Sequence, residues 1–245
     1  MRQNAIKRII GICIAMCCLS FHLSAQNEMS TNQQLTIKQQ GIIRIAALTA
    51  QGELQVLKPS LNKGLDAGLT VNEIKEVLVH LYAYCGFPRS IRGLQTFMEV
   101  LDERIAKGIN DKMGAEASPI NQESSKYERG KKVLGELIKA PQDGALSGYA
   151  AFSPAIDTFL KEHLFADIFE RDVLTYAERE LVTISVISAI GGAEPMLRAH
   201  LNICLNVGLT DIQLTEFVAV IKSSVGEKEA KDAQDVLDDV LKNRL

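Results

Sequence analysis

The first residue suited to proton transfer is Glu180, in the second half of the chain. Glu180 stands directly before a stretch, 181–190, that is apolar apart from small hydroxyls. If this stretch is a buried helix, the carboxyl group loses its hydration, which raises its pKa toward the range of a general acid or base. The alternative is an acid that only stabilises the N-terminus of its helix. Glu180 is therefore a candidate catalytic residue.

Two further candidates lie on the next predicted helix. His200 has Leu197, Leu201 and Cys204 at helical spacing, so its ring is expected to be partly buried. Such a histidine is either a proton carrier or a satisfied core residue. Arg198 could bind a substrate carboxylate through two parallel hydrogen bonds, or it could form a surface ion pair.

The first half of the chain has polar candidates of its own. His80 and Tyr84 are one helical turn apart and could face a cleft together, the alternative being a core face with a polar edge. Cys85 falls in line with Leu78 and Leu81, which favours core packing over a reactive thiol. All three are kept as candidate site residues.

The composition narrows the class of function. The chain has 245 residues, of which 47% are hydrophobic, and a formal net charge of −3, which is ordinary for a folded protein. It has no stripe of Lys and Arg with interleaved aromatic residues, so a nucleic-acid partner is not expected. It has no glycine-rich phosphate loop, no H-E-x-x-H motif and no clustered Cys and His, so no cofactor or metal is predicted. We expect a small-molecule substrate.

Residues 1–25 have the three parts of a secretory signal peptide: a basic start, an apolar run over 9–19, and the small pair Ser24-Ala25 as a cleavage point. The apolar run is shorter than the roughly 20 residues that cross a bilayer. We therefore expect an exported protein, periplasmic or secreted, without a membrane anchor after cleavage. Two cysteines would then remain, too few for a disulfide framework.

The chain also contains an internal repeat. Residues 57–86 align with 197–226, and the segments before them align at a displacement one residue smaller. The identical pairs of the main alignment are Leu57/Leu197, Leu61/Leu201, Asn62/Asn202, Leu65/Leu205, Gly68/Gly208, Leu69/Leu209, Thr70/Thr210, Glu76/Glu216 and Gly86/Gly226. We predict a first unit over 33–108, a linker over 109–125, and a second unit with lead-in helices over 126–245.

Both units are predicted to be helical. Four motifs place a threonine three residues before a Glu or Gln, the pattern of a capping box at a helix N-terminus: Thr36/Gln39, Thr70/Glu73, Thr175/Glu178 and Thr210/Gln213. Gly68 and Gly208 precede two of these motifs, where the preceding helix needs a left-handed end. The apolar stretch 181–190 predicts a central buried helix. No alternating strand pattern is present, so the predicted class is all-α.

Two segments resemble the carboxymuconolactone decarboxylase family, within the wider alkylhydroperoxidase-like superfamily. Residues 178–210 contain the R-E-L-V-T, E-P-x-L-R-x-H and G-L-T elements, and residues 69–88 contain H-x-x-x-Y-x-G-F-P. The resemblance extends over nearly all of the chain after the leader. It implies a duplicated alkylhydroperoxidase-like helical bundle and homo-oligomers, with a trimer of fused pseudo-dimers as one arrangement.

The resemblance implies one of two chemistries. Decarboxylase-type relatives remove carbon dioxide from a carboxylated unsaturated lactone without a cofactor, by general acid–base catalysis. Peroxidase-type relatives carry a Glu, a Cys-x-x-Cys pair and a nearby His. Here Glu180 fits that Glu, but Gly192 and Pro195 stand where the cysteines would be, and His200 follows one place late. A decarboxylase-type enzyme is expected, with a thiol-dependent peroxidase using Cys85 and a non-catalytic binding module as alternatives.

The two units have lost different parts of this pattern. The first unit has Gly41, Lys58 and Ser60 where the second has Glu180, Arg198 and His200, and the second has Val220, Ser224 and Lys228 where the first has His80, Tyr84 and Pro88. We therefore predict that the units pack as an internal pseudo-dimer and share one composite site.

Overall fold

The computed structural model describes residues 34–120 and 123–244, so the predicted signal peptide lies outside the described residues. These ranges contain helices and no strand, which confirms the all-α class. No helix among them combines the length and apolar character needed to cross a membrane. The helices are α2 (Ile37–Gln51), α3 (Leu54–Asp66), α4 (Val71–His80), α5 (Tyr82–Ala106), α6 (Lys126–Ile138), α7 (Gly148–Phe152), α8 (Pro154–Phe159), the π-helix η1 (Leu160–Ile168), α9 (Tyr176–Ile190), α10 (Glu194–Asn206), α11 (Asp211–Ser224) and α12 (Glu227–Lys242).

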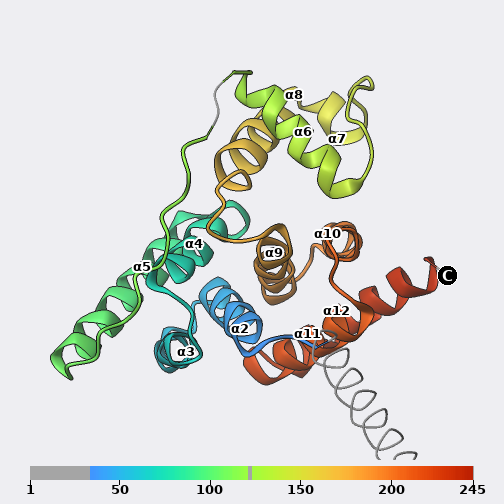
Figure 1. The fold of residues 1–245 in the computed structure, drawn as a ribbon. Helices are drawn as coiled ribbons and strands as arrows, with labels where there is room; N and C mark the ends of the chain where they lie inside the picture. The colour runs from blue at the N-terminus through green and yellow to red at the C-terminus, as the bar shows by residue number, and fades with distance from the viewer. Residues whose placement is uncertain (1–33, 121–122, 245) are drawn as a thin grey trace, which may run out of the picture. The chain divides into compact units, whose positions relative to one another are not determined.

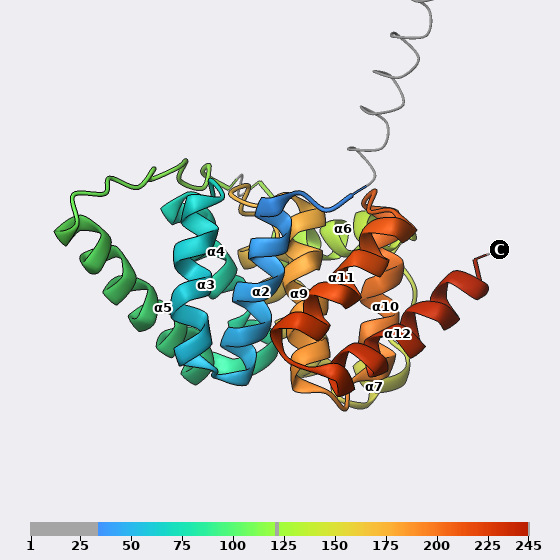
Figure 2. The ribbon, with the colours of Figure 1, turned by 90° about the horizontal axis from the view of Figure 1, so that it is seen from below.

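The helix order repeats, as the sequence alignment predicts. Helices α2 to α5 correspond to α9 to α12, and α2 and α9 have the same length. Helices α2 and α9 lie side by side in the middle of the bundle, with α3 flanking α2 and α10 flanking α9 (Figures 1 and 2). Both central helices are buried over most of their length. Their packing joins the two halves into one continuous hydrophobic core.

The four predicted capping boxes are all present. In each, the threonine hydroxyl accepts from the backbone N–H three residues on, and the Glu or Gln side chain accepts from the threonine N–H, at Thr36, Thr70, Thr175 and Thr210. Gly68 and Gly208 have φ angles of 92° and 99°, as the left-handed ends of α3 and α10 require. Helix boundaries are therefore encoded locally in this chain.

The predicted linker contains no helix in its described residues, 109–120 and 123–125. It nevertheless packs against the start of α4. The backbone N–H groups of Val71 and Asn72 donate to the carbonyl oxygens of Lys112 and Met113, both at 2.9 Å. These donors belong to the first turn of α4, which has no partner for them within the helix.

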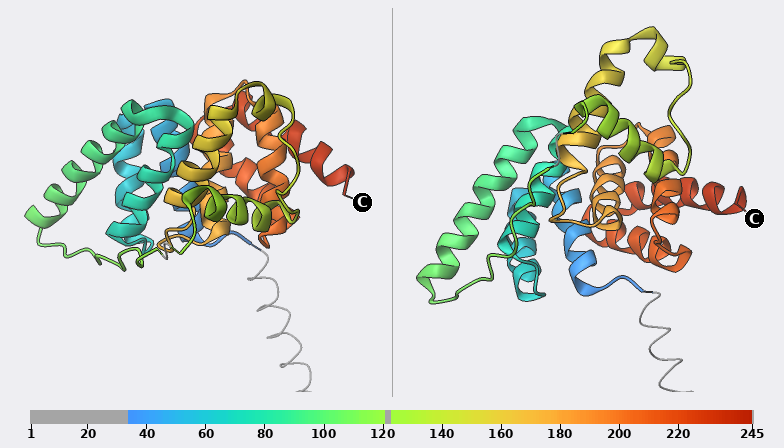
Figure 3. Two further views of the ribbon diagram at one scale, coloured as in Figure 1. Left: turned by 90° about the horizontal axis from the view of Figure 1, so that it is seen from above. Right: turned by 45° about the horizontal axis from the view of Figure 1, so that its top comes forward.

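The lead-in helices form a second, smaller core. Helix α6 packs on η1 (Figure 3). Val133, Leu137 and Phe165 are among the buried side chains between them. Gly130 allows the close approach, because a Cβ atom at that position would collide with the backbone carbonyl of Lys161.

Candidate active site between the two units

Helix α9 supplies the centre of the candidate site. Arg179, Glu180 and Thr183 are fully buried on it. Arg179 and Thr183 are one turn apart and face α4, whereas Glu180 is rotated by about 100° and faces α10. One buried helix therefore carries polar groups toward both of its neighbours.

A buried ion pair holds α9 against the first unit. Arg179 donates from Nη2 to Oε1 of Glu76 on α4 at 2.7 Å, and also to the backbone carbonyl of Arg171. Arg171 binds the same carboxylate through Nε at 2.9 Å and through Nη2 at 2.9 Å. Burial raises the pKa of Glu76, but the bonds to Arg171 and Arg179 outweigh this and leave the pKa below its ordinary value. Glu76 is therefore a buried carboxylate.

His80 lies one turn after Glu76 and is fully buried. Its Nδ1 is 3.1 Å from Nη1 of Arg179, and its Nε2 is 2.9 Å from the hydroxyl of Thr183. Because a guanidinium can only donate, Nδ1 accepts and Nε2 carries the proton that goes to Thr183. Burial, then the charges of Arg179 and His200, lower the pKa of His80 well below its ordinary value. His80 is therefore a neutral imidazole with a defined tautomer.

Thr183 connects His80 to Tyr84, in the first turn of α5. Its hydroxyl is 3.0 Å from the phenol oxygen of Tyr84 and 3.0 Å from the carbonyl of Arg179. When Thr183 donates to Tyr84, the phenol proton is free for another acceptor. Burial and the nearby charge of Glu180 raise the pKa of Tyr84. Tyr84 is therefore a neutral donor at physiological pH.

On the other side of α9, Glu180 binds His200 of α10. Oε2 of Glu180 is 2.8 Å from Nδ1 of His200, and the carboxylate is fully buried. Oε1 of Glu180 makes no hydrogen bond to the described residues. The His200 side chain is 14% exposed, so this pair reaches the surface through the imidazole.

The two groups meet at Tyr84. The rings of Tyr84 and His200 are 6.0 Å apart and nearly perpendicular, and those of His80 and Tyr84 are 5.5 Å apart. The structure thus brings together four of the six predicted site residues, two from each unit. Their catalytic roles stay predictions.

The structure separates Arg198 from these four residues. Arg198 is about half exposed and pairs with Asp239 of α12. Two residues along a helix correspond to a rotation of about 200°, so Arg198 and His200 point to nearly opposite sides of α10. Arg198 thus forms the surface ion pair that was one of its two interpretations, and its binding of a substrate carboxylate stays a prediction.

The two cysteines of the described ranges, Cys85 and Cys204, are held as thiols. Cys85 is half-buried and donates to the carbonyl of Leu81 at 3.2 Å. Burial raises the pKa of Cys85 to about 11. Cys204 is fully buried, as its helical spacing predicts, and burial raises its pKa as well. Because the thiolate is the nucleophile in thiol chemistry, both environments disfavour that reactivity.

Three buried residues of the site are absent from the sequence-based candidates: Glu76, Arg179 and Thr183. A signal for them existed. Glu76 is one turn before His80, and Arg179, just before the apolar stretch, is one turn from Thr183 within it, so each pair had to share a helix face. The sequence did not say which faces would meet.

The equivalent positions of the other unit form a different arrangement. Arg44 replaces Thr183 there and lies 3.1 Å from the hydroxyl of Ser223. Glu216, the counterpart of Glu76, accepts from the backbone N–H of Leu35 at 2.6 Å. Of the two positions related by the repeat, the one between α4 and α9 therefore has both histidines, the tyrosine and Glu180, whereas the other keeps a counterpart of Glu76 alone.

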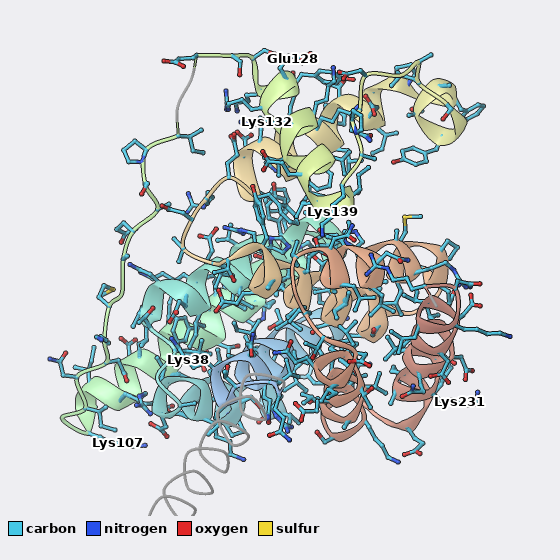
Figure 4. All side chains as sticks on the ribbon, turned by 45° about the vertical axis from the view of Figure 1, so that its right-hand side comes forward. Lys38, Lys107, Glu128, Lys132, Lys139 and Lys231 are labelled. Atoms are coloured by element: carbon cyan, nitrogen blue, oxygen red, sulfur yellow. The ribbon has the colours of Figure 1, made fainter. Side chains whose placement is uncertain are left out.

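Large surface cavities lie elsewhere in the described residues. One of about 480 Å³ runs along α6, where its lining includes Glu128, Lys132 and Lys139 (Figure 4). Another of about 300 Å³ is lined in part by Tyr149 and Lys161. Among the described residues, no group of three or more His, Cys, Asp or Glu is placed to hold a metal ion.

Comparison with known proteins gives the relationship. The model of the carboxymuconolactone decarboxylase family matches residues 21–97 and 154–239, one segment in each unit. The chain is 26% identical to 4-carboxymuconolactone decarboxylase of Acinetobacter baylyi over 122 residues, which is 49% of this chain and 90% of that protein. It is 27% identical to an uncharacterized protein of Methanocaldococcus jannaschii over 79 residues, which is 32% of this chain and 74% of that protein. The matches cover most of the chain and fall on both copies of the repeat, so this protein is a duplicated member of the carboxymuconolactone decarboxylase family.

Proposed function

We propose that this protein is an enzyme that acts on a small carboxylated or lactone substrate by general acid–base chemistry, without a cofactor. The observation that carries the proposal is the meeting of the His80–Thr183–Tyr84 chain with the Glu180–His200 pair, at a ring separation of 6.0 Å between Tyr84 and His200. If these groups served only to hold the helices together, a neutral phenol next to a partly exposed imidazole would not be needed. That arrangement therefore favours a catalytic role.

The proposed reaction is a decarboxylation. The bond from the substrate carboxylate to its carbon breaks, carbon dioxide leaves, and the electron pair moves into the conjugated lactone carbonyl as a dienolate. A proton then adds to carbon. The oxyanion needs a preorganised donor, and the carbon needs a general acid.

The residues fit these two tasks. Tyr84 stays protonated because burial raises its pKa, and its O–H becomes free for the dienolate oxygen when Thr183 donates to the phenol. Glu180 holds Nδ1 of His200, which leaves Nε2 of the partly exposed imidazole as the atom that would contact a ligand. Nε2 of His80 orients the Thr183 hydroxyl, and the guanidinium of Arg179 fixes the His80 ring through Nδ1.

The test is decarboxylation of 4-carboxymuconolactone, the compound in the name of the Acinetobacter relative. We expect Tyr84→Phe and His200→Gln to lower kcat/KM on the order of 100-fold or more, as the loss of an oxyanion donor or a general acid does. His163→Gln is the matched control, because His163 is half exposed on η1 and lies outside the site. Equal turnover in all three variants would rule the proposal out.

The complete burial of Glu180 favours a second candidate function, a non-catalytic binding or assembly module. A carboxylate that no ligand reaches would serve packing through His200. In that case the unaltered chain would show no turnover, and Glu180→Gln would only lower the thermal stability.

We also propose that the protein works outside the cytoplasm, since residues 1–25 have the pattern of a cleaved leader. N-terminal sequencing of the protein from its native host tests this. A mature chain that begins near Gln26 supports export, and a chain that begins at Met1 contradicts it.

A further inference from the structure

The last turn of α9 has buried oxygen atoms without their usual partners. Ser188 is 6% exposed, and its hydroxyl makes no hydrogen bond to the described residues. The N–H of Gly192, which would continue the helical pattern onto the carbonyl oxygen of Ser188, instead donates to Oε1 of Glu194 at 3.2 Å. The N–H of Gly191 donates to the carbonyl of Ile187. Both oxygen atoms of Ser188 can therefore serve as ligand atoms.

Ser188 lines a small cavity between α9, α10 and α12. The cavity has a volume of about 10 Å³, which is the space of one water molecule or one metal ion. Three acidic residues also line it: Glu194, Glu229 and Asp232. Helix α12, which carries the last two, packs on both α9 and α10 (Figure 2). Because the C-terminal end of α9 is also the negative end of its helix dipole, the electrostatic potential in this cavity favours a cation.

The internal repeat shows what occupies the equivalent place in the first unit. Gly52 is the counterpart of Gly191, and Arg89 is the counterpart of Glu229 when the main alignment is continued. A Cβ atom at Gly52 would collide with Nη1 of Arg89, so this guanidinium lies directly over the C-terminal end of α2. A positive charge is favourable at that end of a helix. In the second unit a carboxylate stands where the first unit has this cation.

The buried hydroxyl also differs between the two units. Thr49, the counterpart of Ser188, donates to the carbonyl of Ile45 at 2.6 Å, and its own carbonyl accepts from the N–H of Gly52 at 3.1 Å. Helix α5 packs closely on its methyl group, because a Cβ atom at Gly93 would lie 2.8 Å from that carbon. The first unit therefore satisfies both oxygen atoms and fills the space, whereas the second unit does neither.

We infer that the second unit binds a metal cation at the end of α9, where the first unit uses the guanidinium of Arg89. Its ligands are the hydroxyl and carbonyl oxygens of Ser188 and the carboxylates of Glu229 and Asp232, with water completing the shell. All of these are oxygen atoms, which hard cations prefer, and the cavity is too small for an organic cation. Two carboxylates with neutral oxygens and water suit Ca²⁺, whose coordination is flexible, better than Mg²⁺, which demands a near-ideal octahedron.

Lys228 competes with the metal for one of these ligands. Its Nζ is 2.7 Å from Oδ2 of Asp232, but the two side chains are 77% and 45% exposed. An exposed pair of this kind contributes little to stability, so a divalent ion can displace the ammonium group. Lys228→Met should therefore bind Ca²⁺ more tightly than the unaltered chain, and weaker binding would contradict the assignment.

The test is a Ca²⁺ titration of the purified chain after treatment with a chelator, followed by calorimetry and by thermal melting. Ser188 is about 12 Å along α9 from Glu180, so neither measurement depends on the proposed enzyme activity. We expect one Ca²⁺ per chain, a dissociation constant on the order of 10⁻⁴–10⁻³ M, and a melting temperature that rises with Ca²⁺ concentration. The absence of binding heat and of a melting shift, or an equal shift with Mg²⁺ or with NaCl at matched ionic strength, would overturn the inference.

Substitutions at the ligands test the location. Ser188→Ala and Glu229→Gln should each weaken Ca²⁺ binding on the order of tenfold or more, because each removes a ligand atom. Asp235→Asn is the matched control, since Asp235 is an exposed acid on the same helix that pairs with Lys231. Glu229→Arg should restore the arrangement of Arg89, which raises the melting temperature of the calcium-free chain and removes its response to Ca²⁺. An equal loss in the control, or a Ca²⁺ response that persists in Glu229→Arg, would place the ion elsewhere and refute the site.

Discussion

The buried pair between Arg179 and Glu76 makes a strong prediction about stability. Arg179→Met keeps an unbranched side chain of similar length and removes the guanidinium. The change deletes the bond to Glu76 at 2.7 Å and the bond to His80 at 3.1 Å, together with the bond to the Arg171 carbonyl. It leaves a nearly fully buried carboxylate with Arg171 as its remaining cation.

The magnitude follows from these contacts. A hydrogen bond to a charged group contributes about 1.5–3 kcal/mol and a neutral one about 1 kcal/mol, and breaking one side of a buried pair costs about 3–5 kcal/mol. Two features reduce the loss here. Arg171 still neutralises Glu76, and the guanidinium no longer has to be desolvated, a cost seen in the lowered pKa of Arg179. We expect the free energy of unfolding to fall by about 3 kcal/mol.

The assay is urea unfolding followed by far-ultraviolet circular dichroism, for Arg179→Met, Glu76→Gln and the double variant. Because the two residues are in contact, the double variant should be clearly more stable than the sum of the single changes predicts. Arg198→Met is the control: its pair with Asp239 is about half exposed, so its removal should cost below about 1 kcal/mol. A loss for Arg179→Met no larger than that of the control would refute the reasoning.

Three further predictions concern titration, thiols and packing. In the folded protein the pKa of His80 lies below its ordinary value, so its contribution to stability is present above pH 6.5 and is lost as the pH falls below it. His80→Gln should therefore flatten the pH dependence of the free energy of unfolding between pH 6.5 and 5. An unchanged slope in the variant would contradict this. Mild hydrogen peroxide should leave Cys85 and Cys204 unmodified by mass spectrometry, because burial raises both pKa values, and oxidation of either would revive the thiol chemistry. Gly130→Ala should lower the melting temperature by several degrees, because the new methyl group meets the Lys161 carbonyl; an unchanged melting temperature would show that α6 and η1 can separate.

The fold could be predicted largely from the sequence because its signals are local. Each capping box joins a threonine to a residue three places on, and the repeat supplies the same signal twice. The burial of α9 also followed from its apolar composition. The kink at Gly86 and the packing of 109–120 on α4 depend on neighbours, and were not predicted.

The candidate site was predictable only in part. The residue types pointed to His80, Tyr84, Glu180 and His200, and the complementary losses in the two units predicted that they share one site. For Arg198 the charge alone left a substrate contact and a surface ion pair open, and only its direction on the helix, toward Asp239, distinguishes them in the structure. Glu76 and Arg179 belong to the site because they form an ion pair with each other. The two residues are 103 positions apart in the chain, so no local pattern predicts the pair.

The sequence by itself determined that this protein is a duplicated set of capped helices in the carboxymuconolactone decarboxylase family, since caps, periodicity and repeats are written in neighbouring residues. Only the tertiary structure decided that Arg179 and Thr183 face His80 while Glu180 faces His200. The physical reason is that the neighbour of each face of α9 depends on how all the helices pack together in the core, which no local stretch of sequence specifies.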